Sequence, residues 1–192
     1  MRQIIIAIIL STLASTPATA NTTGRVEFRV FNTGTSTRPV FGLNTLIEHT
    51  LTPKLKVWAW FQVEEKWAEA YTGLAYAPAV WFEFGLAAGV EQADLPWRLG
   101  GYVWMGNKYF SFLALVEEGG SGPWYQATFL AKPLAWLEFG GMIKRYAGLG
   151  YRLDFSPSTG PNVKLWVAHL FYDPESNSVD VKRILGGLVY SF

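Results

Sequence analysis

The 192-residue sequence contains no cysteine, only two histidines and no marked excess of either charge. Without cysteine the chain can form neither a disulfide nor a thiolate metal site, and two histidines far apart offer no ligand cluster, so we expect no metal and no cofactor. Sixteen basic residues against fifteen acidic ones give a net charge of +1. That balance argues against nucleic acid as a partner.

The sequence also lacks an apolar run long enough for a transmembrane helix, which needs roughly 20 residues. An uncharged stretch such as Ala70 to Phe82 is broken by Gly73 and Pro78. A membrane protein of this composition therefore has to cross the bilayer with strands, because closed barrels and helices alone satisfy their backbone groups in lipid.

The N-terminus resembles a secretory signal peptide. Arg2 precedes a ten-residue apolar run, Ile4 to Leu13, and the small residues Ala18-Thr19-Ala20 follow. We expect cleavage after Ala20, which divides the chain into a signal peptide, 1–20, and one β-barrel domain, 21–192. A retained anchor is the alternative, but the apolar run is short for it.

The rest of the chain alternates between apolar and other residues with a period of two, which is the signature of strands. From Val80 to Val90, for example, Phe82, Phe84 and Leu86 share one face with Val80 and Val90. An aromatic-led unit also recurs, at Trp58, Trp81, Tyr109, Trp136 and Trp166, and each copy follows a short turn rich in Pro, Gly or Asn. Each unit is one hairpin of two strands.

Five hairpins with a first and a last strand predict twelve strands, ten being the alternative, in an up-and-down antiparallel transmembrane barrel. In such a barrel the short turns face the periplasm and the longer loops face outward. The expected strands are 24–32, 39–50, 54–64, 69–77, 80–91, 97–106, 108–117, 123–132, 135–145, 147–155, 162–173 and 181–192.

The last strand ends with alternating apolar residues, Ile184, Leu188 and Tyr190 among them, and a terminal Phe192. This ending resembles that of bacterial outer-membrane β-barrels. The resemblance implies an outer-membrane location and recognition of the last strand by the barrel-insertion machinery, and it carries no functional residue. A soluble β-barrel or sandwich would alternate too, but its polar face would carry more Lys, Ser and Thr than this one.

With the apolar rows facing lipid, the opposite rows face the lumen. The residues that we predict to line it or to form a constriction are Trp58, Trp60, Trp81, Glu83, Tyr109, Trp136, Glu138, Arg152 and Trp166. Aromatic faces and charges could select a small polar solute; alternatively the rings fill space or belong to an interfacial girdle. We expect Glu138 to pair with Arg152, and the mixed signs to give weak ion selectivity.

The favoured function is a narrow porin-like channel for passive passage of small solutes, with the lipid bilayer as its surroundings. The alternatives are a plugged structural or adhesive barrel and a lipid-acting hydrolase that uses His169. His49 falls near the periplasmic end of the expected barrel and His169 in its outer half, both on the apolar face of their strands. Because they cannot meet, and no serine shares the face of His169 on neighbouring strands, the sequence argues against an enzyme.

Overall fold

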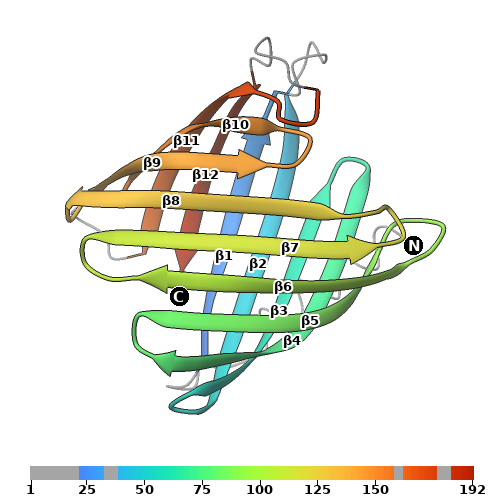
Figure 1. The fold of residues 1–192 in the computed structure, drawn as a ribbon, viewed down its shortest axis with the longest axis horizontal. Helices are drawn as coiled ribbons and strands as arrows, with labels where there is room; N and C mark the ends of the chain where they lie inside the picture. The colour runs from blue at the N-terminus through green and yellow to red at the C-terminus, as the bar shows by residue number, and fades with distance from the viewer. Residues whose placement is uncertain (1–21, 33–38, 158–161, 177–182) are drawn as a thin grey trace.

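The computed structural model describes residues 22–32, 39–157, 162–176 and 183–192, and the expected signal peptide, 1–20, lies outside them. Twelve strands make up the fold (Figure 1). They are β1 (Thr22–Phe31), β2 (Val40–Thr52), β3 (Leu55–Glu64), β4 (Trp67–Ala79), β5 (Phe82–Glu91), β6 (Trp97–Gly106), β7 (Phe110–Gly119), β8 (Trp124–Leu134), β9 (Leu137–Lys144), β10 (Gly148–Phe155), β11 (Val163–Tyr172) and β12 (Arg183–Ser191).

The strands form one closed barrel in which each strand is antiparallel to the next along the chain, and β1 closes the ring against β12. At the closure, Val26 lies opposite Tyr190 and Phe31 opposite Leu185. The prediction of an up-and-down barrel of twelve strands is therefore confirmed. Within the part of the chain that the structure describes, no helix is long and apolar enough to cross a membrane.

The two ends of the barrel differ in their connections. At one end, which we call the terminal end, β1 begins, β12 finishes, and residues 53–54, 80–81 and 135–136 make tight turns. The other end, the loop end, carries the connection 92–96 between β5 and β6 and the connection 120–123 between β7 and β8. The sequence pattern predicts that the terminal end faces the periplasm.

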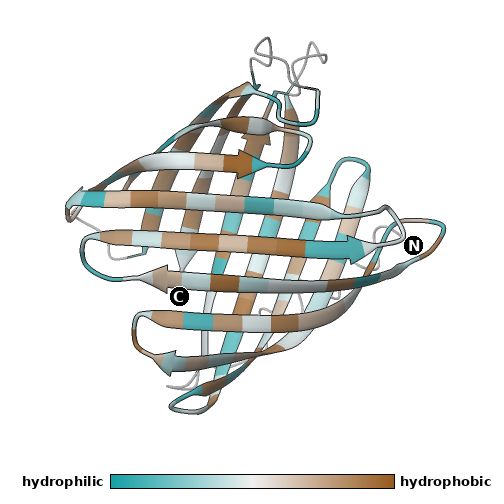
Figure 2. Cartoon of the chain, viewed as in Figure 1, coloured by the Kyte–Doolittle hydropathy of each residue, from teal (hydrophilic) through white to brown (hydrophobic). Residues whose placement is uncertain are grey.

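Side chains alternate between the outside and the inside along each strand, as the banding in Figure 2 shows. On β5, Phe84, Leu86 and Val90 are exposed on the outside, whereas Glu83 and Glu91 are buried inside. The barrel is thus inverted relative to a water-soluble protein, because its large apolar side chains face out and its charges face in.

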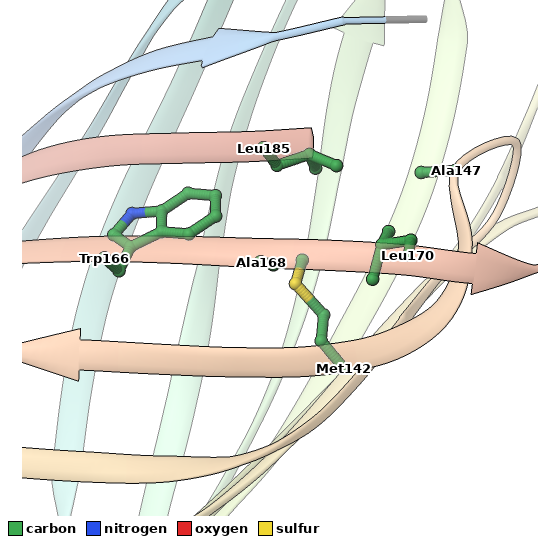
Figure 3. Close-up of a cluster of buried hydrophobic side chains, with 6 residues drawn as sticks. All are labelled: Met142, Ala147, Trp166, Ala168, Leu170 and Leu185. Atoms are coloured by element: carbon green, nitrogen blue, oxygen red, sulfur yellow. The ribbon is translucent and has the colours of Figure 1, made fainter. Parts of the chain in front are cut away.

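Two apolar clusters occupy opposite sides of the interior. The first packs Trp166, Ala168, Leu170 and Leu185 around Met142 and Ala147 (Figure 3). The second contains Trp58, Tyr71, Ala75 and Ala87. Both clusters occupy interior space, and the polar groups described below share the remainder of the lumen with them.

Candidate solute pathway through the barrel

Three cavities follow one another through the interior. The mouth cavity, at the loop end, measures about 380 Å³ and is lined by Trp67, Ser121 and Tyr146 among others. A central cavity of about 330 Å³ shares Gln62, Trp124, Lys144 and Leu185 with it. A third cavity of about 290 Å³, between β2 and β7 on the terminal side, shares Arg25, Trp60 and Trp104 with the central one. The central cavity shares lining residues with each of the other two, and together the three define the candidate path.

Arg98, on β6, is the centre of the most extensive ionic network. Its guanidinium is 3% exposed and donates to Glu91 Oε2 at 2.5 Å and to Glu117 Oε2 at 2.9 Å. The hydroxyl of Tyr71 donates to Glu117 at 2.8 Å, and that of Ser121 donates to Glu91 at 2.8 Å. A buried cation needs such partners, because leaving water is costly for a charge.

A second network joins the first three strands. Arg29 Nη2 donates to Asn44 Oδ1 and to Gln62 Oε1, both at 2.6 Å, and Asn44 donates in turn to Glu27 at 3.0 Å. Gln62 donates to Glu64 at 2.9 Å. The register places Glu27, Asn44 and Gln62 side by side at one level, and Arg29 and Glu64 on either side of Gly42 at the next inward-facing level. The network therefore holds one side of the lumen in a single arrangement.

At the terminal end Lys56, on β3, lies between two carboxylates. Its Nζ is 2.6 Å from Glu83 and 3.7 Å from Glu48. Tyr102 donates its hydroxyl to Glu83 at 2.6 Å and packs edge-on against Trp58, with ring centres 5.3 Å apart. The predicted residues Trp58 and Glu83 therefore belong to one cluster that borders the 290 Å³ cavity.

The expected pairing of Glu138 with Arg152 is wrong. Both side chains line the central cavity, but Glu138 accepts from Lys164 at 2.6 Å, and Arg152 donates to Asp154 at 2.6 Å. The cross-strand register explains the difference, because Glu138 lies opposite Asp154 and Arg152 lies opposite Gly140. Arg152 reaches Asp154 along its own strand, two residues away on the same face.

Arg152 also contacts Trp166, another residue predicted to line the lumen. Its guanidinium lies 4.3 Å from the ring centre of Trp166, which is the geometry of a cation–π contact. The indole of Trp166 donates to Glu27 at 2.6 Å. Trp60, the remaining predicted interior aromatic residue, packs 5.4 Å from the ring of Tyr71 and borders both the central and the 290 Å³ cavity.

Three of the predicted lumen residues are not in the interior. Trp81 and Trp136 lie in the tight turns and Tyr109 in the bend before β7, with exposed fractions of 56%, 42% and 66%. The reason is that β5, β7 and β9 begin at residues 82, 110 and 137, each two residues after the expected start. A residue in a turn does not keep the strand's alternation, so these three rings are exposed at the terminal end instead of facing the lumen.

The interior network around Arg98 was absent from the predicted lining. Glu69, Tyr71, Glu91 and Glu117 all belong to it. Each occupies the inward phase of its strand, so extending the period of two along β4, β5 and β7 would have found them. Their convergence on one guanidinium depends on register, which the sequence alone does not give.

The two signs of charge are separated across the lumen. The half of the ring from β2 to β7 is mainly acidic, and the half from β8 through β12 to β1 is mainly basic. Among the described residues, the first half presents Glu48, Glu64, Glu69, Glu83, Glu91 and Glu117 with Lys56 and Arg98, and the second presents Arg25, Arg29, Lys132, Lys144, Arg145, Arg152, Lys164 and Arg183 with Glu27, Glu138 and Asp154.

Neither histidine lies in this path. The hydroxyl of Thr22 lies 2.9 Å from Nδ1 of His49 near the terminal end, and His169 lies exposed on β11 beside the ring of Phe171. Across the described residues there is no group of three or more His, Cys, Asp and Glu side chains placed to hold a metal ion.

The fold is that of the outer-membrane porins. The KdgM porin matches with a TM-score of 0.54 over 88% of this chain and 99% of its own, at 13% identity. KdgM in complex with disordered oligogalacturonate matches at 0.55. The NanC porin matches at 0.52, over 88% of this chain and 98% of its own, at 9% identity. No family model and no curated protein matches the sequence.

Proposed function

We propose that the protein is a narrow channel of the bacterial outer membrane that lets small polar solutes pass by diffusion. The observation that carries the proposal is the central cavity, which shares lining residues with the mouth cavity and is itself lined by Glu138, Lys164 and Ser191 near the terminal end. The lining of ion pairs and amides in these cavities suits polar molecules, because it offers hydrogen bonds in place of those to water.

The porin fold supports the same function, since the named structures of this fold are porins. One KdgM structure is a complex with an oligogalacturonate, a chain of acidic sugars. In the present lumen both signs of charge line the cavities, so we propose small polar solutes rather than polyanions. The proposed passage requires no catalytic step.

The dimensions of the barrel suit a bilayer. A strand of ten residues, such as β5, extends about 34 Å, and a tilt of about 40° reduces this to about 26 Å across the membrane. The apolar band of outer-membrane barrels has about this height. Recognition of β12 and Phe192 by the insertion machinery stays a prediction.

Single-channel recording from the refolded chain in planar bilayers tests the proposal. We expect discrete current steps, and Trp60→Ala should enlarge them because its indole borders two of the three cavities. Trp81→Ala is the matched control, since that ring lies in an exposed turn, and its conductance should equal that of the unmodified protein.

A folded barrel without current steps would refute the channel and favour the plugged structural alternative. Folding is checked independently by the shift in gel migration between heated and unheated samples. Equal conductance of the Trp60→Ala and unmodified proteins would show that ions follow a path other than the three cavities.

A further inference from the structure

The mouth cavity at the loop end brings charges of opposite sign to face one another. Glu64, Glu69 and Arg98 line it from β3, β4 and β6, and Lys144, Arg145 and Arg183 line it from the other half of the ring. Its volume, about 380 Å³, falls in the range of small-ligand sites.

The acidic side carries more negative charge than its one arginine can neutralise. Arg98 is within 3.3 Å of Glu69, Glu91 and Glu117, so one guanidinium serves three carboxylates. Glu69 has the longest of these three contacts: its Oε2 lies 3.3 Å from Nε of Arg98, and among the described residues no hydrogen bond reaches that oxygen. Its side chain is 6% exposed. A cationic group entering the cavity would supply that hydrogen bond.

The basic side of the cavity carries positive charges that lack a carboxylate partner. Within the described residues, none of the ion pairs includes Lys144 or Arg183. The amino group of Lys144 lies 5.7 Å from the centres of the Phe31 and Trp124 rings. Among the described residues, none forms a hydrogen bond with the buried Nη1 of Arg183. A carboxylate entering the cavity would neutralise this side.

We propose that the mouth cavity binds small zwitterionic solutes, with the ammonium group toward Glu69 and the carboxylate toward Lys144 and Arg183. A zwitterion satisfies both walls at once. A solute with a single charge pairs with one wall and is repelled by the other. The site therefore selects zwitterions by repelling singly charged solutes as well as by attracting both ends of a zwitterion. Trp67 and Trp124 also line the cavity and offer contact to the carbon chain between the charges.

This inference deepens the proposed channel and rests on it, because the site would select the solutes that pass. The test compares four probes of equal chain length: 6-aminohexanoate, 6-hydroxyhexanoate, 6-aminohexan-1-ol and 1,6-hexanediol. Titration calorimetry with the refolded protein should show that the zwitterion 6-aminohexanoate binds about tenfold more tightly than each of the others.

Two substitutions test the roles of the opposing walls. Lys144→Met should weaken binding of 6-aminohexanoate about tenfold. Glu69→Gln should also weaken binding of 6-aminohexanoate about tenfold, and 6-hydroxyhexanoate should then bind more tightly than 6-aminohexanoate. Lys132→Met is the matched control, because Lys132 lines the central cavity and not the mouth. Its affinity should be unchanged.

Equal affinity for 6-aminohexanoate and 6-hydroxyhexanoate would overturn the proposal in favour of a plain anion site, and absent binding would overturn it outright. Calorimetry and conductance together test the zwitterion site separately from the channel. Zwitterion binding to a barrel that does not conduct would refute the channel and keep the site, whereas conductance with no preference among the four probes would refute the site and keep the channel. If a variant fails to fold, the comparison of probes on the unmodified protein decides.

Discussion

Of the substitutions that we propose, we expect removal of the Arg98 side chain to lower the free energy of unfolding most. Arg98 is 3% exposed and joins Glu69, Glu91 and Glu117. Arg98→Met leaves three carboxylates close together in the interior without their cation, so unfolding free energy should fall by about 3–5 kcal/mol. Urea unfolding in detergent micelles, followed by tryptophan fluorescence, measures the change.

The control for this substitution is Lys132→Met. Lys132 takes part in none of the ion pairs within the described residues, so its loss should change stability by less than about 1 kcal/mol. A loss at Arg98 no larger than that at Lys132 would mean that the carboxylates find other compensation, and that the Arg98 network is not a stabilising centre.

For Glu138 and Arg152, the predictions from the sequence were right about orientation and wrong about partners. Glu138 and Arg152 face the lumen as the alternation indicates. Their partners are Lys164 and Asp154. A period of two determines which face a side chain occupies, but pairing depends on register and side-chain reach, which act between strands far apart in the sequence.

At the scale of the strands, the sequence predicted the number and order of elements well and their first residues less well. The barrel has the expected twelve strands, yet Trp81 and Trp136 belong to turns. When turn residues are apolar or aromatic, they continue the alternating pattern of the strand in the sequence, so the pattern does not show where the strand begins. Local sequence therefore does not mark the residue at which pairing stops, and this error placed three exposed rings in the expected lining.

Gly150 illustrates a constraint that belongs to a pair of strands. A Cβ added there would lie 1.9 Å from the carbonyl oxygen of His169 and 2.7 Å from Cα of Leu170. The pairing of β10 with β11 also shifts in register next to it. Gly150→Ala should force these strands apart and lower the unfolding free energy by about 1–3 kcal/mol, measured by urea unfolding.

Gly141, on the neighbouring strand β9, provides the matched control. The nearest atom to an added Cβ there is the Gly150 carbonyl oxygen at 3.8 Å, an ordinary contact. Gly141→Ala should change stability by less than about 0.5 kcal/mol. If the two alanine variants proved equally stable, close approach of the backbones at Gly150 would not limit the fold.

At the scale of the whole barrel, side chains are separated in two ways. Apolar side chains lie outside and charged ones inside, and within the lumen the negative charges lie mainly opposite the positive ones. The first separation follows from alternation and was visible in the sequence. The second was not, because the sequence supplies only a balanced total of +1. Closure of the ring brings the acidic strands β2 to β7 opposite the basic ones. The balanced total therefore conceals a lumen whose two sides carry opposite charge, and the proposed binding of zwitterions rests on that asymmetry.

The first separation predicts how the barrel meets a bilayer. Trp136 is 42% exposed in a turn at the terminal end, whereas Trp166 is 6% exposed inside. Aromatic rings at the rim of a membrane barrel lie at the level of the lipid headgroups. In vesicles, phospholipids brominated near the headgroup should therefore quench Trp136, and lipids brominated deep in the chain should quench it less. Trp136→Phe should reduce the quenchable fluorescence and Trp166→Phe should leave it unchanged. If neither brominated lipid quenched the folded protein, its apolar exterior would not face lipid, and the membrane assignment would fail together with the channel that depends on it.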